Sequence, residues 1–203
     1  QWRFIESVNG RNSLGLSTSD FDQSHRILST LSKKFTYLKG KLATTISLTY
    51  IGQSGAPLSY VYVNSMTRDD GTGGGNDLIY IPTAAELQAQ TFLSNTVGTV
   101  TYTPQQQKDA LESYIQKDKY LSKNRGKFAD RNGARLPFTH NLDLKLAQDF
   151  VLKFGKNSYQ LQLTWEVYNF TNMLNRDWGK QYFASNDQFG LISFAGYVAA
   201  NNL

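Results

Sequence analysis

The feature that most constrains this chain is a segment from Phe138 to Phe154 in which apolar and polar residues alternate almost without a break. Its first face carries Phe138, His140, Leu142, Leu144, Leu146, Gln148, Phe150, Leu152 and Phe154. The opposite face carries four charged residues, Asp143, Lys145, Asp149 and Lys153. Because successive side chains of a strand point to opposite sides, the pattern predicts one long strand with an apolar and a charged face.

The length of this strand indicates what its apolar face contacts. Strands of ordinary domains run about 5–6 residues, whereas a tilted strand that crosses a membrane needs roughly 9–11. The charged face would need ionic partners or water in a packed sandwich. Inside a wide barrel it would line an aqueous lumen, so the pattern favours lipid on one side and water on the other.

Further segments continue this pattern and set the expected organisation of the chain. The strands are predicted at about 1–7, 24–38, 41–54, 138–154 and 158–171. Short polar turns at 38–41 and 155–158 join two pairs of strands as hairpins, whereas the long segment 55–137 lies at the opposite end. Short turns at one end and long loops at the other are typical of outer-membrane barrels.

The predicted fold class is therefore all-β: a segment of an antiparallel transmembrane β-barrel, with long extracellular loops that carry short helices. Aromatic residues near the ends of the apolar faces are expected to form the interfacial girdles. These residues are Tyr37, Tyr50, Phe138, Phe154 and Tyr159. A soluble all-β domain is the alternative that the alternation leaves open.

Composition excludes several classes of protein. The chain contains no cysteine, so it has neither disulfides nor thiolate sites. Its net charge of +5 comes from scattered Lys and Arg, which argues against nucleic-acid binding. It has no apolar run of about 18 residues that could span a bilayer as a helix. Both ends look interrupted, and we interpret the sequence as a fragment of a longer protein.

The long loop 55–137 contains two helix signals. Thr83 with Glu86 forms a capping-box pattern ahead of a short helix. The segment Thr103-Pro104-Gln105-Gln106 is a stronger capping-box pattern, and it predicts a helix over about 104–122. The predicted buried side consists of Ala110, Leu111, Tyr114, Ile115 and Leu121. A loop of this length with its own helices is usually functional.

Candidate ligand-binding residues lie in the same loop. The segments "YVYV" (60–63) and "LIYI" (78–81) flank a glycine run and are predicted to form a short hairpin. Tyr60, Tyr62 and Tyr80 could stack on a ligand, and Asp77 beside them could bind it. The alternative is that these aromatic rings pack against neighbouring loops.

Other chemistry is sparse. Only His25 and His140 could serve a catalytic triad, and both fit better as interfacial residues. A calcium loop could draw on Asp69, Asp70, Asn76 and Asp77, but their spacing does not match an EF-hand. We therefore expect no catalytic residues, no metal site and no cofactor, and we expect the protein not to be an enzyme.

Several stretches together resemble a known family. They are "DFDQSHRI", "IGQSGAPLSYVYV", "GGGNDLIYIP", "RNGARLPFTHNLDLKLAQDF" and "WEVYNFTNMLN". In this order they resemble the C-terminal barrel region of TonB-dependent outer-membrane transporters, in particular the Oar-like type of Bacteroidetes. The resemblance runs from about Phe21 to Asn175.

This resemblance implies a barrel of 22 strands in the Gram-negative outer membrane, closed by an N-terminal plug and powered through TonB. TonB would contact parts that precede these residues, and a surface lipoprotein could cover the barrel. The implied function is import of a nutrient, which could be an oligosaccharide, a peptide or a metal chelate. The alternatives are a passive channel or adhesin-like barrel and, from another class, a soluble lectin-like domain.

Overall fold

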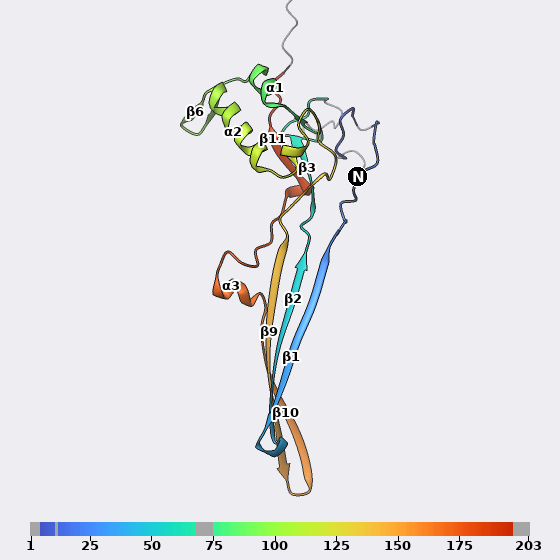
Figure 1. The fold of residues 1–203 in the computed structure, drawn as a ribbon, viewed down its shortest axis with the longest axis vertical. Coiled ribbons are helices and arrows are strands. Elements are labelled where there is room, and N and C mark those ends of the chain that lie inside the picture. The colour runs from blue at the N-terminus through green and yellow to red at the C-terminus, as the bar shows by residue number, and fades with distance from the viewer. Residues whose placement is uncertain (1–4, 11, 68–74, 197–203) are drawn as a thin grey trace, which may run out of the picture. The chain divides into compact units, whose positions relative to one another are not determined.

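The computed structural model describes residues 5–10, 12–67 and 75–196 (Figure 1). These residues fall into two compact units. The strand unit takes its residues from 23–55 and 136–183, and the insert unit takes its residues from 1–22, 56–135 and 184–203. Within the described residues, no helix has the length and apolar character needed to cross a membrane.

The strand unit is a four-stranded antiparallel sheet with the order β1-β2-β9-β10 (Figure 1). Its strands are β1 (Arg26–Tyr37), β2 (Leu42–Gln53), β9 (Thr139–Phe154) and β10 (Asn157–Val167). All four begin within two residues of the predicted positions. Each strand therefore pairs with the next long strand along the chain, as in an up-and-down barrel.

Two short turns connect the hairpins at one end of this sheet. The first contains the 3-10 helix η2 (Leu38–Gly40), where Leu38, Lys39 and Gly40 all have positive φ. The second is a two-residue turn in which Gly155 has φ 58° and Phe154 pairs with Asn157. Glycine adopts this left-handed backbone without steric cost, which explains its place at the turn.

Large side chains on the apolar face of the sheet are exposed. Ile27, Leu31, Leu163 and Trp165 are 53%, 71%, 59% and 60% exposed. A water-soluble domain rarely leaves so continuous an apolar surface open. The sheet thus exposes its apolar side chains, as the strands of a membrane protein do. Its buried alanines, Ala43 and Ala147, lie on the polar face.

The insert unit is built from much shorter elements. Its strands are β3 (Pro57–Tyr62), β4 (Tyr80–Ile81), β5 (Asn95–Val97), β6 (Val100–Tyr102), β7 (Lys127–Phe128), β8 (Ala134–Arg135) and β11 (Gln188–Ile192). Its helices are α1 (Ala84–Ala89), α2 (Pro104–Lys117), η3 (Leu121–Lys123) and η4 (Ser185–Asp187). β3 pairs in parallel with β11 and antiparallel with β8, while β4 pairs with β7 and β5 with β6.

A conventional core holds the insert unit together. Its fully buried large side chains include Ile79, Ile81, Leu87, Ile115 and Leu121. Burying each such side chain contributes roughly 1.5–3 kcal/mol. The two units therefore meet their surroundings in opposite ways, since the insert unit hides its apolar residues and the strand unit displays them.

Both predicted capping boxes are present. Thr83 and Glu86 cap α1, and Thr103 and Gln106 cap α2, with Pro104 in its first turn. Leu111, Ile115 and Leu121 are buried as expected, whereas Ala110 is exposed and Tyr114 is 37% exposed.

The predicted helix 104–122 is too long, because α2 ends at Lys117. Asp118 has an extended backbone, and its Oδ1 accepts hydrogen bonds from the N–H groups of Tyr120 and Leu121 at 2.9 and 2.7 Å. This local side-chain cap competes with the helix and starts the separate turn η3.

Three other predicted bounds need correction. Of the strand expected at 1–7, residues 1–4 lie outside the described part, and Ser7 forms only an isolated bridge with Asp77. The strand expected at 158–171 ends at Val167, because Asn169 turns to φ 53° before the helix α3 (Phe170–Leu174). The segment expected as the loop 55–137 has strands of its own, and its residues 56–135 form a folded unit together with 1–22 and 184–203.

Gly133 offers a test of packing in the insert unit. A Cβ added there would lie 2.5 Å from Tyr120 Oη, and that hydroxyl is held by Asp130 through its backbone N–H and its carboxylate. We expect Gly133→Ala to lower the stability of the insert unit by about 1–3 kcal/mol. The measurement is protease resistance of the full-length protein at rising urea concentration. Gly15→Ala, which meets nothing within 4 Å, is the matched control, and equal loss in both variants would contradict this packing.

Candidate functional site

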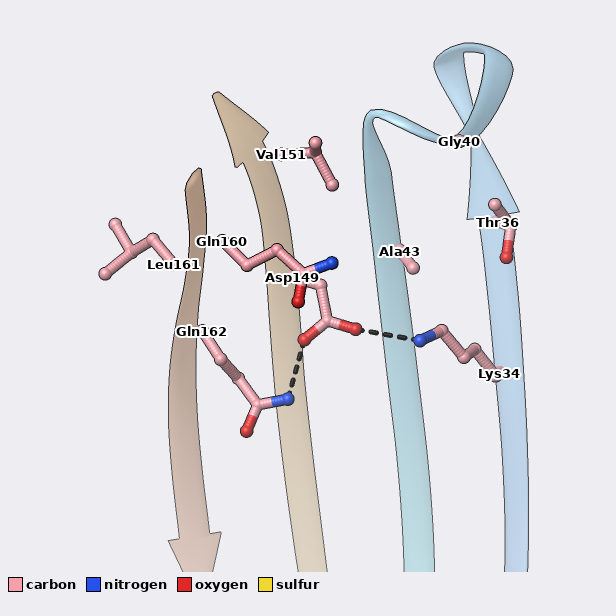
Figure 2. Close-up of a pocket in the computed structure, with 9 residues that line it drawn as sticks. All are labelled: Lys34, Thr36, Gly40, Ala43, Asp149, Val151, Gln160, Leu161 and Gln162. Carbon is pink, nitrogen blue, oxygen red and sulfur yellow. Dashed lines mark hydrogen bonds and ion pairs between the residues drawn. The ribbon is translucent and has the colours of Figure 1, made fainter. Parts of the chain in front are cut away.

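The polar face of the sheet contains a hydrogen-bonded charge pair that joins three strands. Lys34 Nζ on β1 lies 2.9 Å from Asp149 Oδ2 on β9, and Gln162 Nε2 on β10 donates to Asp149 Oδ1 at 2.6 Å. Figure 2 shows these side chains lying across the strands. They line a hollow of about 550 Å³ on this face. Charged and polar side chains of the polar face therefore bond one another across the sheet.

A second charged group on this face repeats the arrangement. Lys145 Nζ lies 2.7 Å from Glu166 Oε1, and Tyr168 Oη donates to Glu166 Oε2 at 2.7 Å. All these groups keep substantial exposure, which suits a wall in contact with water. Lys and acidic residues alternate along it, so the face shows no large surface of one charge sign.

Aromatic residues mark both ends of the opposite, apolar face. At the end with short turns, the rings of Phe154 and Tyr159 lie 5.9 Å apart. At the other end, Tyr50 Oη is 2.7 Å from His140 Nδ1. His140 also lies 4.9 Å from the ring of Phe138, so it belongs to an aromatic cluster at the end of the sheet. The predicted girdle residues therefore lie at two levels.

The separation of these two levels fits the thickness of a membrane. Tyr50 pairs with Leu142 and Tyr159 pairs with Leu152, so ten residues of β9 separate them. At about 3.3 Å per residue and a strand tilt of about 40°, that length spans about 25 Å along the membrane normal. This equals the usual height of the lipid-facing band of an outer-membrane barrel.

A polar cluster lies on the apolar face, and its members satisfy one another. Tyr37 Oη and Thr44 Oγ1 both donate to Gln148 Oε1, at 2.8 and 2.6 Å. Since an unpaired polar group in hydrocarbon costs several kcal/mol, these bonds explain how Gln148 is tolerated on the apolar face.

Two of the predicted ligand-binding residues are buried in the insert unit. Tyr60 is 3% exposed, and its ring stacks on Tyr120 at 6.3 Å and meets Phe189 edge-on at 5.9 Å. Its hydroxyl donates to Asp118 Oδ2 at 2.8 Å, and burial raises the pKa of Tyr60 far above its usual value. Burial likewise raises the pKa of Tyr120, to about 12. Tyr60 is therefore a core residue, and its ring cannot stack on a ligand.

Asp77 is also buried, at 1% exposure, and organises the chain after β3. Its carboxylate accepts hydrogen bonds from the N–H groups of Met66 and Thr67 at 2.5 and 3.0 Å, and from Thr67 Oγ1 at 2.7 Å. The carboxylate is satisfied by its own neighbours, so Asp77 anchors a turn rather than facing a ligand. This backbone role was not visible in the sequence.

The predicted hairpin around these residues forms only in part. Tyr62 N–H donates to Asp77 O at 2.9 Å, and Ile79 N–H donates to Tyr60 O at 3.1 Å. Tyr80 instead joins β4 and pairs with Phe128 of β7. Tyr62 and Tyr80 thereby remain partly exposed and face a common cleft.

This cleft, which we call the tyrosine cleft, has a volume of about 820 Å³. It is lined by Tyr62, Tyr80, Tyr114, Phe92, Gln90, Gln107, Asn95 and neighbouring residues of 90–95, 110–111 and 191–196. Burial raises the pKa of Tyr62, and a hydrogen bond to Glu86 raises that of Tyr80. Both phenols therefore stay neutral at physiological pH. Sequence reasoning missed Phe92, Gln90 and Gln107, since no pattern marks residues brought together by tertiary packing.

The residues considered for metal or acid–base chemistry do not converge. Asp69 and Asp70, two of the candidate calcium ligands, lie outside the described residues. Across the described part of the chain, no group of three or more His, Cys, Asp or Glu side chains could hold a metal ion. His25 and His140 are both in the strand unit, where His140 bonds Tyr50.

Comparison with known proteins gives one match. Residues 7–201 match the family described as an outer membrane beta barrel domain. No curated protein and no solved structure is similar enough to this chain to count as a match.

The two faces of β10 can be compared by introducing arginine on each face in turn. Leu163 lies on the apolar face and is 59% exposed, whereas the adjacent Thr164 lies on the polar face. Placing arginine near the middle of the lipid-facing band costs roughly 2–4 kcal/mol. We expect Leu163→Arg to destabilise the full-length protein in lipid vesicles by that amount and Thr164→Arg to have little effect, as measured by urea unfolding. Equal effects would contradict this assignment of the faces.

Proposed function

This chain belongs to the outer membrane beta barrel domain family and lies in the cell outer membrane, and we propose that it forms part of a TonB-dependent receptor that imports a nutrient. The observation that supports this proposal most is the contrast between the two units. The chain has amphipathic strands long enough to cross the membrane and, beside them, a folded insert unit with its own core and cleft, most of which comes from the segment between β2 and β9.

A simple pore has little need of such an insert. Long structured segments between strands are usually functional, and binding residues concentrate on segments supported by a rigid scaffold. An importer must select its ligand before moving it, and a cleft in the insert unit supplies a place for selection. We therefore favour a receptor over a passive channel or an adhesin-like barrel.

The proposal extends to strands beyond the four described. Among the described residues, β1 and β10 are the two edges of the long sheet. An open sheet edge is not tolerated in lipid, because its backbone groups lack partners. In the proposed receptor these edges pair with further strands of a barrel, which the resemblance sets at 22.

The partners and the chemistry follow from the same proposal. TonB would act through a plug and a periplasmic segment that are separate from these residues, and a surface lipoprotein could cover the insert. We expect binding and transport without catalysis. The soluble lectin-like alternative fits poorly, since family membership and the exposed apolar face both favour a membrane location.

Electrical conductance of the full-length protein in planar bilayers tests the proposal. A receptor closed by a plug is expected to pass no steady current and to bind the purified periplasmic domain of TonB. A passive channel would conduct continuously and would not bind that domain. Steady current without TonB binding would therefore overturn the proposal.

A further inference from the structure

The tyrosine cleft combines aromatic rings with side-chain amides. Tyr62 and Tyr80 come from β3 and β4, and Tyr114 from α2. Phe92 follows α1 and is partly exposed. The volume of the tyrosine cleft, about 820 Å³, lies within the range of roughly 300–1,000 Å³ that is usual for small-ligand sites. The cleft is therefore large enough for a ligand of several rings.

The amides that line the cleft have hydrogen-bonding capacity to spare. Gln107 Nε2 donates to Leu93 O at 2.7 Å and to other backbone carbonyls, while its Oε1 has no partner among the described residues. The side chain of Gln90 likewise makes no hydrogen bond with the described part of the chain, although it lies at the cleft. An amide offers both a donor and an acceptor, which suits a ligand that carries hydroxyl groups.

Among the described residues, none that lines the cleft is charged. Two charged side chains lie beside the lining, and Lys108 Nζ is 6.0 Å from the centroid of the Phe92 ring. Lys108 Nζ donates to Gln88 O at 2.6 Å, and Glu86 accepts from Tyr80 Oη at 2.9 Å and from Thr83 N–H at 2.8 Å. An anionic chelate would require cationic partners, and a short peptide would require partners for its charged termini. Among the described residues, the lining itself has no charged side chain for either kind of ligand, and Lys108 beside it is bonded to Gln88 O.

From this lining we infer that the tyrosine cleft binds a short, uncharged oligosaccharide. Sugar rings carry weakly positive C–H groups on their faces, which pack on the negative face of an aromatic ring. Their hydroxyl groups exchange hydrogen bonds with amides and phenols. The inference rests on the proposed function, because the bound sugar would be the imported nutrient. Binding of the sugar can nevertheless be measured without transport.

Two substitutions at the cleft have matched controls in the same unit. Phe92→Ala removes a ring from the lining, and Phe21→Ala removes one that is 93% exposed and lies away from the cleft. Gln90→Ala removes an amide that bonds no described residue, and Gln116→Ala removes an exposed amide of α2 that is not part of the lining. None of the four is in the buried core.

The experiment uses the full-length protein, purified in detergent, on an array of neutral tri- and tetrasaccharides. The array also carries the same chains bearing uronic acid or sulfate, and end-blocked tripeptides. We expect at least one neutral sugar to bind, and Phe92→Ala to weaken that binding about tenfold. Gln90→Ala should weaken it about fivefold, while Phe21→Ala and Gln116→Ala leave it unchanged.

Three results would overturn the inference. They are absence of binding to every neutral sugar, tighter binding of the acidic chains or the peptides, and equal effects of cleft and control substitutions. Sugar binding by a protein that conducts steadily and does not bind TonB would support the cleft but contradict the proposed import. A plugged, TonB-binding protein without sugar binding would contradict the cleft alone.

Discussion

The antiparallel pairing of β2 with β9 is the interaction on which the architecture depends. It joins residues 42–53 to 139–150 in one continuous register, from Leu42 with Phe150 to Gln53 with Thr139. Because side chains alternate, this register places apolar residues of both strands on one face and polar residues on the other. A slip by one residue would expose Asp143 and Lys145 to the apolar side, so burial of charge in lipid enforces the register.

The same pairing makes a large insertion possible between adjacent strands. Gln53 and Thr139 are partners, so the chain leaves and re-enters the sheet at neighbouring points. The entropic cost of closing a loop rises only slowly with its length. A segment such as 56–135 can therefore supply most of a folded unit, which residues 1–22 and 184–203 complete, at little cost to the sheet. Within that unit, Pro57 pairs with Arg135, which again brings the two ends of the insertion together.

The two candidate sites differ in what their residues do. On the polar face, Lys34 and Gln162 both bond Asp149 across strands, so the charges of this face are matched within the sheet. In the tyrosine cleft, amides and phenols face an uncharged hollow and retain capacity to bond a ligand. In the proposed receptor, selection of the ligand therefore falls to the insert unit.

The long strands, their two faces, the tight turns and both helix caps could be predicted from the sequence, because each depends on neighbours within a few residues. Local periodicity and capping chemistry predicted β9 to within a residue and the starts of α1 and α2. The residues that line the cleft could not be predicted in this way, because they are brought together by packing between distant segments. Tyr60 and Asp77 look like surface residues in a polar loop, but packing against Tyr120 and hydrogen bonds from Thr67 bury them. Phe92 and Gln107, which no pattern marks, reach the cleft because long-range contacts set the fold of the insert, and such contacts leave no period in a sequence.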